Sequence, residues 1–328
     1  MIKRFLRATS VIDLQVLDKY NILIMEKKKN SIIELLRFIF AMNVVKNHGY
    51  FPYQGSLFSP EGISVEFFFV LSGFLFAMSL KKYEDRFIVK DALIMYKDKL
   101  LRLGIPFFVG IGFNVLYAVT FKTSDFNVWV YLWYVEDMLI VFGIFFLLRR
   151  IFKNDIVFFS IIFAIAVGSS VVHAMPSFRS WGFFRALPAI SIGMLTSKLP
   201  KLDPKYKPMV LVGFSVACLA VLRILLFEFS FAEEEVLDVV IYPALIYFAF
   251  QIDCSNRVLD YLGAISFGLY AFQSVARYMR DVGYQNRWLQ FAVILACAVA
   301  ADLIKRLIVY LKTRRKAQEL LPQNNPSE

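Results

Sequence analysis

The chain has 328 residues and a formal net charge of +11, and 59% of its residues are hydrophobic. A mean hydropathy of +0.59 excludes an ordinary soluble domain and predicts a protein whose surroundings are largely lipid. The charge does not indicate a nucleic-acid partner, because the basic residues fall between apolar runs and not on a soluble domain. No metal is expected either, because the three cysteines are scattered without metal-ligand spacing: Cys218, Cys254 and Cys297.

Residues 1–30 are expected to form a cytoplasmic amino-terminal segment. Its first part lacks a long apolar core and a small-residue cleavage site, so it does not look like a signal peptide. Met25 is followed by Glu-Lys-Lys-Lys-Asn and then by the first apolar run, as at a natural cytoplasmic start. Met25 is therefore a candidate for the true start of translation.

The first apolar run, residues 31–50, carries more polar residues than a membrane anchor needs. Arg37 and His48 are eleven residues apart, which is about three helical turns, so a helix places them on one face. Glu34 lies on the same stripe, three residues before Arg37. Charged groups inside a membrane span are costly, which makes this stripe a candidate functional site. A plain interfacial hydrogen bond is an equally good explanation of His48 when spacing alone is considered.

The sequence predicts an all-α, polytopic integral membrane protein with about ten transmembrane helices. The candidate spans are 31–50, 62–80, 103–121, 128–148, 155–173, 181–197, 208–228, 235–251, 258–277 and 288–308. The loops are short and no Gly/Ser-rich or Pro-rich linker interrupts them, so residues 31–311 are expected to form one transmembrane domain. Residues 312–328 are expected to be a disordered cytoplasmic tail.

The distribution of lysine and arginine predicts the orientation. If the amino terminus is cytoplasmic, most of these residues fall in inner segments and few in outer loops, as the positive-inside rule requires. Both termini are then cytoplasmic. Arg37 lies toward the cytoplasm, and His48 lies near the outer surface, about 16 Å away along the helix axis.

Six segments, taken in chain order, resemble the membrane-bound acyltransferases called acyltransferase family 3. The first helix carries the Arg-x10-His pattern of that family, and the second resembles its Val-Asp/Glu-x-Phe-Phe-x-x-Ser-Gly-Phe signature around Glu66. The remaining matches are Lys99-Leu-Leu-Arg102 ahead of Pro106, the segments with Asp137 and Arg185, and Ser266-Phe-Gly-Leu-Tyr270. The resemblance covers about residues 30–280, and the chain is similar to the stand-alone membrane form.

The resemblance implies transfer of an acyl group, commonly acetyl from acetyl-CoA, to a hydroxyl of a glycan such as a surface polysaccharide. It implies His48 as general base and Glu66 as a group that orients His48. Donor contacts would come from Arg37, Lys99 and Arg102. Residues with an acceptor-side or structural role would be Asp137, Arg185 and Tyr270. Acyl-CoA would be a co-substrate, with no permanently bound cofactor, and the location would be the bacterial cytoplasmic membrane, in contact with membrane lipid.

The chain departs from the family pattern at several places. Lys99 keeps the charge of the first basic position but loses the bidentate geometry of arginine. Gln273 stands where the family often has a histidine and cannot act as a general base, and Asp302-Leu-Ile-Lys replaces a common Glu-Pro ending. The alternative function is a secondary transporter or a lipid-linked sugar flippase, although no internal repeat is visible. Lys99 and Arg102 could also serve topology alone, and Glu66 could serve helix packing.

Overall fold

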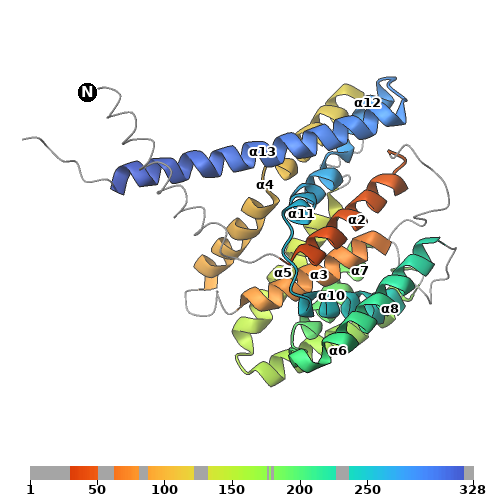
Figure 1. Ribbon diagram of the computed structural model, residues 1–328, viewed down its shortest axis with the longest axis vertical. Coiled ribbons are helices and arrows are strands. Elements are labelled where there is room, and N and C mark those ends of the chain that lie inside the picture. Colours follow the sequence, from red (N-terminus) through yellow and green to blue (C-terminus); the bar gives the residue numbers. More distant parts are fainter. Residues whose placement is uncertain are drawn as a thin grey trace, which may run out of the picture.

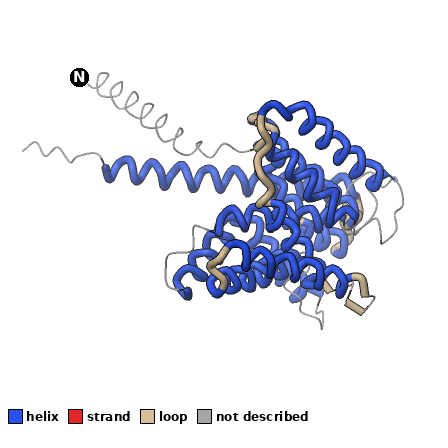
Figure 2. The backbone as a smooth tube through the Cα atoms, turned by 90° about the horizontal axis from the view of Figure 1, so that it is seen from below, coloured by secondary structure: helices blue, strands red, loops and turns tan. Residues whose placement is uncertain are grey.

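The computed structural model describes residues 30–50, 63–80, 88–121, 132–175, 177–178, 181–226 and 236–320. This part of the chain is 87% helical and contains no strand, which confirms the predicted all-α class (Figure 2). The candidate start at Met25 lies outside the described residues. The predicted tail is helical over residues 312–320, and residues 321–328 lie outside the described part.

The helices follow one another with short connections. In chain order they are α2 (Ser31–Asn47), α3 (Ile63–Leu80), α4 (Ile88–Phe121), α5 (Trp133–Ile151), α6 (Asp155–His173), α7 (Gly182–Thr196), the 3₁₀ turn η2 (Pro204–Tyr206), α8 (Lys207–Leu226), the π-helical turn η3 (Leu237–Ile241), α10 (Tyr242–Gln251), α11 (Arg257–Ala271), α12 (Gln273–Asp281) and α13 (Arg287–Leu320). Helix α13 extends well beyond the bundle formed by the others (Figures 1 and 2).

Asparagine residues start several of these helices. The side chain of Asn30 accepts hydrogen bonds from the backbone nitrogens of Ile32 and Ile33, at 3.1 and 3.2 Å, and so satisfies two of the free donors at the start of α2. Its amide nitrogen also donates to the carbonyl oxygens of Ala249 and Ile252, at 2.8 and 3.0 Å. One side chain therefore both caps α2 and fixes its first turn against the end of α10.

Helix α4 consists of two straight parts joined at Gly104. This glycine has φ +61° and ψ −149°, a conformation that other residues rarely adopt, and Pro106 follows two residues later. The kink separates residues 88–103 from the apolar remainder of the helix. The predicted span 103–121 is thus confirmed as a helix, and a further helical arm precedes it.

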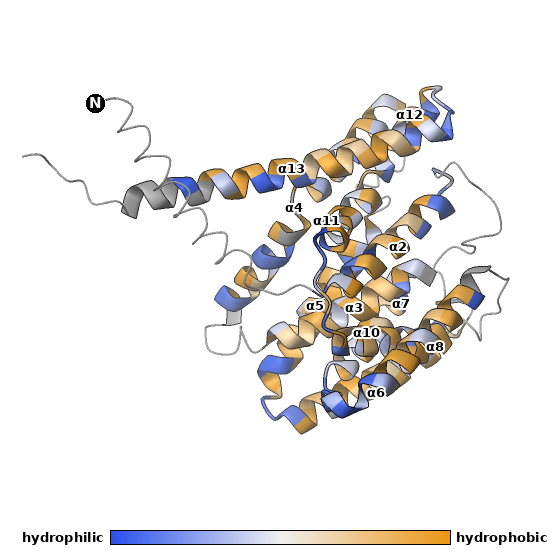
Figure 3. Ribbon diagram, viewed as in Figure 1, coloured by the Kyte–Doolittle hydropathy of each residue, from blue (hydrophilic) through white to orange (hydrophobic). Residues whose placement is uncertain are grey.

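Length and composition identify several helices of the described part as membrane spans. Leu103–Phe121, Asp155–His173 and Pro204–Arg223 are long and apolar enough to cross a bilayer. Shorter apolar helices are Ser64–Leu80, Gly182–Thr196 and Leu237–Gln251. Hydrophobic residues predominate along α6 and α8 (Figure 3). The chain is therefore a membrane protein, and the predicted number of about ten spans stays a prediction.

The α3–α7 pair is packed backbone to backbone through two glycines. A Cβ atom added to Gly73 would lie 2.8 Å from the carbonyl carbon of Ile190. A Cβ atom added to Gly193 would lie 2.8 Å from the carbonyl carbon of Val70 and 2.9 Å from the backbone nitrogen of Phe74. Small residues allow such close approach of membrane helices, so these glycines set the distance between α3 and α7.

Replacement of Gly193 by alanine is expected to lower the free energy of unfolding by about 1–3 kcal/mol, because the new methyl group meets rigid backbone. The measurement is thermal or denaturant unfolding of the purified protein in detergent. Gly168→Ala is the matched control, because nothing lies within 4 Å of the new methyl group and alanine favours the helix. Equal stability of the two variants would contradict the assigned packing.

Candidate active site

Helix α2 is antiparallel to α3, and two contacts fix their register. The amide nitrogen of Asn43 donates to the Ser64 hydroxyl at 2.6 Å. The ring of Phe40 stacks on that of Phe67 with centroids 4.0 Å apart. Both pairs follow the same antiparallel register, so Glu66 on α3 is level with Ala41 on α2.

Helix α2 also packs against α11, beside it in Figure 1, and the two helices are parallel. The hydroxyl of Ser31 donates to Asp260 at 2.6 Å. Three residues further along both helices, the side chain of Glu34 occupies the space above Gly263, where an added Cβ would collide with it. This register predicts which residues of α11 and α12 lie beside each turn of α2.

Arg37 lies in the half of α2 nearer Ser31. Its guanidinium is paired with Glu34 at 2.8 Å, as the spacing of three residues allows. Its charge also acts on Tyr134, at the start of α5. The hydroxyl of Tyr134 is 2.8 Å from that of Ser72 and donates to the carbonyl oxygen of Phe68 at 3.2 Å. Arg37 therefore faces a polar contact between α3 and α5.

Tyr270, a predicted site residue on α11, belongs to the same region. Its ring lies edge-on to that of Tyr134, with centroids 5.9 Å apart, and only 7% of the residue is exposed. It also has a backbone hydrogen bond to Tyr134. Tyr270 of α11 and Tyr134 of α5 are therefore direct neighbours.

His48 lies directly after α2, where the helix ends. Its backbone N–H donates to the carbonyl oxygen of Val44 at 3.2 Å, and the residue is partly exposed. Gly49 follows with φ +80°, a conformation that favours glycine and turns the chain away from the helix axis. The imidazole is thus carried at one end of the bundle on a well-defined turn. Its role as general base stays a prediction.

Glu66 and Arg185, predicted as separate site residues, are ion-pair partners. The Nε of Arg185 donates to Glu66 Oε1 at 2.8 Å, and Nη2 contacts the same oxygen. The guanidinium carbon lies 5.5 Å from the centre of the Trp133 ring and interacts electrostatically with Asp137. Asp137 itself packs over Gly182, at the start of α7. One arginine of α7 therefore connects α3 and α5.

This arrangement changes the expectation for Glu66. The α2–α3 register places Glu66 level with Ala41, which is about 10 Å below His48 along the axis at 1.5 Å per residue. Its carboxylate is 1% exposed and engaged by Arg185. The sequence left two roles open for Glu66, orientation of His48 and helix packing, and the contact with Arg185 joins α3 to α7. Orientation of His48 by Glu66 stays a prediction, and the contact with Arg185 is an additional role.

The predicted donor residues lie on the arm of α4 that precedes the kink. The ammonium of Lys99 is 5.0 Å from the ring centre of Phe76 and 4.7 Å from that of Phe142. These two rings stack with centroids 4.2 Å apart, so the charge of Lys99 lies against an aromatic pair between α3 and α5. Arg102 is on the same helix, one turn later, and its side chain lies outside the described part.

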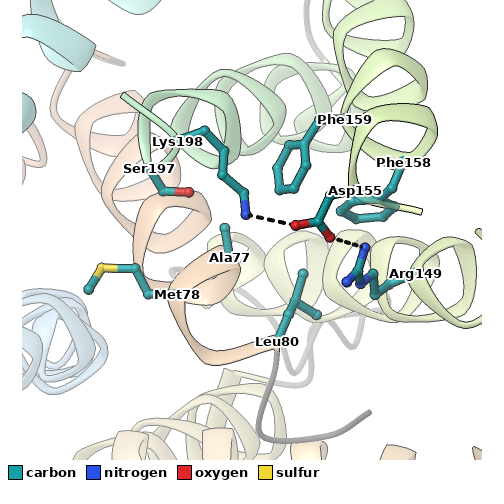
Figure 4. Close-up of a pocket in the computed structure, with 9 residues that line it drawn as sticks. All are labelled: Ala77, Met78, Leu80, Arg149, Asp155, Phe158, Phe159, Ser197 and Lys198. Atoms are coloured by element: carbon teal, nitrogen blue, oxygen red, sulfur yellow. Dashed lines mark ion pairs between the residues drawn. The ribbon is translucent and has the colours of Figure 1, made fainter. Parts of the chain in front are cut away.

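A small pocket lies beside Leu80, at the end of the bundle away from His48, and Figure 4 shows its lining side chains. Its volume is about 100 Å³, and it is lined by residues of α3, α5 and α6 and by the two residues that follow α7. Asp155 binds Arg149 at 2.7 Å and Lys198 at 3.8 Å, so one carboxylate is shared by the two cations of the pocket. We regard this pocket as an ion-pair junction between helices, separate from the stripe on α2.

The pattern of an acyltransferase domain matches residues 30–304, which covers α2 through most of α13. The chain belongs to acyltransferase family 3. It is therefore an acyltransferase, and membership implies an acyl donor and a hydroxyl acceptor. Neither the curated proteins nor the solved structures gave a significant match to it.

The structure of this acyltransferase adds residues that the sequence argument did not select. Tyr134 contacts Ser72 and receives the charge of Arg37, and Asn43 joins α2 to α3. Ser72, on α3, makes a hydrogen bond with the hydroxyl of Tyr134. A polar residue within an apolar helix was the signal available for Asn43 and Ser72. No such signal marks Tyr134, because tyrosine is common near membrane surfaces.

Proposed function

We propose that this acyltransferase moves an acyl group, most simply acetyl, from acyl-CoA to a hydroxyl of a surface polysaccharide or another glycan. The observation that carries the proposal is the order of polar residues along α2. Arg37, with Glu34 and Tyr134 around it, occupies the half of α2 nearer Ser31, and His48 stands at the opposite end. Polar residues toward both ends of one helix suit a reaction whose two substrates approach from opposite ends of the bundle.

His48 acts as the general base in this proposal. A hydroxyl is a weak nucleophile, and a neutral imidazole takes its proton while the oxygen attacks the thioester carbonyl carbon. The carbon–sulfur bond then breaks, the acyl group stays on the acceptor oxygen as an ester, and the proton leaves with the CoA thiol. No oxidant or permanently bound cofactor is needed, because acyl-CoA is itself the activated co-substrate.

The donor binds at the end of the bundle that carries Ser31 and Leu80, which we place on the cytoplasmic side of a bacterial inner membrane. The phosphates of acyl-CoA require cations there, which Lys99 and Arg102 would supply, and Arg37, deeper in the bundle, would contact the pantetheine arm. Both termini are cytoplasmic in this arrangement, in agreement with the distribution of basic residues. Asp137, Arg185 and Tyr270 would shape the space in which the acceptor meets the acyl group.

The acceptor and the reaction can be tested together. Surface glycans from cells with and without the gene would be compared by mass spectrometry, and loss of one acyl mass per repeat is expected in cells without it. The deacylated glycan is then the acceptor for purified protein with acetyl-CoA. We expect release of one CoA thiol for each ester formed, and little release without glycan.

The rival function, a secondary transporter or lipid-linked sugar flippase, makes the opposite prediction. Protein reconstituted in vesicles would move a lipid-linked glycan across the bilayer without any acyl-CoA consumption. That outcome would overturn the proposed enzymatic activity.

A further inference from the structure

Gln273, the first residue of α12, is a buried glutamine whose side-chain amide makes no hydrogen bond within the described part of the chain. None of its surface is exposed, and neither its side-chain oxygen nor its nitrogen has a hydrogen bond among the residues that the structure describes. A buried amide without hydrogen bonds costs stability, so a group of this kind is normally satisfied by something else. Gln290 shows the ordinary case: it is 2% exposed and its Nε2 donates to the carbonyl oxygen of Tyr284 at 2.7 Å.

The position of Gln273 connects it to the stripe on α2. Tyr270, three residues earlier, packs edge-on against Tyr134. The parallel register of Ser31 with Asp260 and of Glu34 with Gly263 places Tyr270, near the end of α11, level with Ala41. Phe272 and Val275, on either side of Gln273, belong to the same buried cluster as Val45 of α2, so the start of α12 lies near the end of α2 that carries His48.

A second unsatisfied group lies in this half of the bundle. The side-chain oxygen of Asn43 is buried and has no hydrogen-bond partner within the described residues, although its nitrogen donates to Ser64. Two buried amides with unused hydrogen-bonding capacity therefore lie toward the end of α2 that carries His48. A buried polar group in this state calls for an explanation, and a catalytic role is one of those known.

We propose that Gln273 is a catalytic residue whose Nε2–H donates a hydrogen bond to the carbonyl oxygen of the bound thioester. The inference rests on the proposed acyl transfer from acyl-CoA. When the acceptor oxygen attacks the carbonyl carbon, the π-electron pair moves to the carbonyl oxygen, which becomes negatively charged. The hydrogen bond from Gln273 stabilises this charge, and His48 on the other side of the carbonyl receives the hydroxyl proton. Collapse of the intermediate expels the CoA sulfur and restores the neutral carbonyl.

Gln273→Leu separates this role from a structural one. We expect kcat with acetyl-CoA and the deacylated glycan to fall about 10²–10³-fold, as after loss of an oxyanion-binding donor, with little change in the KM for acetyl-CoA. The thermal unfolding temperature should stay the same or rise, because the variant removes an unsatisfied buried amide. Gln273→His, which keeps an N–H donor, should recover part of the lost rate.

Gln290→Leu is the matched control. It removes a buried glutamine that does have a hydrogen bond, so the unfolding temperature should fall while kcat of the folded protein is kept. If Gln273→Leu lowers the unfolding temperature as Gln290→Leu does, or retains kcat because only water occupies the site, the assignment is overturned. If the parent protein releases no CoA thiol at all, the proposed function fails instead.

Discussion

His48→Ala is expected to reduce acyl transfer by at least 10²–10⁴-fold, the usual contribution of a positioned general base. The chain has one other histidine, His173. If His173 lies outside the site, no second imidazole is available to take the proton. His173 is carried by α6, which packs on α7, whereas His48 ends α2. The rate of CoA thiol release with saturating acetyl-CoA and glycan measures the loss. Expression and unfolding temperature should change little, because His48 is partly exposed and its turn is held by backbone bonds.

His173→Ala is the comparison that this chain offers. His173 is 4% exposed, so its replacement should lower the unfolding temperature, whereas the activity of the folded fraction should be retained. Substantial activity in His48→Ala would remove His48 as the base. Loss of activity in both variants with no loss of folding would point to a site that includes α6.

Hydrophobic runs predicted most of the helices, because an apolar segment in lipid has little choice but to form one. The runs 103–121 and 155–173 coincide with Leu103–Phe121 and Asp155–His173. The break between α11 and α12 interrupts the predicted span 258–277, and it falls at Phe272, where neither glycine nor proline gives a signal. Helix α13 runs to Leu320 because its basic residues are good helix formers, although the same residues looked like a tail.

Within the candidate site, the sequence could predict contacts between residues of one helix but not contacts between different helices. Arg37 and Glu34 are three residues apart, so their ion pair follows from helix geometry. Arg185 and Glu66 are 119 residues apart, and no pattern within one sequence tells which of several charged groups will meet inside a bundle. The side-chain amide of Gln273 makes no hydrogen bond among the described residues. This depends on where the folded chain buries it, which the residue type alone does not reveal.

Arg185→Met is expected to destabilise the protein by about 3–5 kcal/mol, because it removes the guanidinium that binds the buried carboxylate of Glu66. The double variant Glu66→Gln with Arg185→Met should recover a large part of this loss, because position 66 then carries no charge. The free energy of unfolding in detergent, measured for both single variants and the double variant, gives the coupling energy.

Lys205→Met calibrates this result within the same chain. Lys205 also pairs with a carboxylate, that of Asp203, at 3.7 Å, but the Asp203 side chain is 55% exposed, so water replaces the lost partner. An exposed pair of this kind should contribute only about 0.2–1 kcal/mol. If Arg185→Met costs no more than Lys205→Met, or if the two single losses simply add in the double variant, the pair does not hold α3 to α7. A large coupling energy between Glu66 and Arg185, together with a reduced rate of acyl transfer in Arg185→Met, would instead mean that Arg185 fixes the position of α3 and of the α3 surface that faces α2.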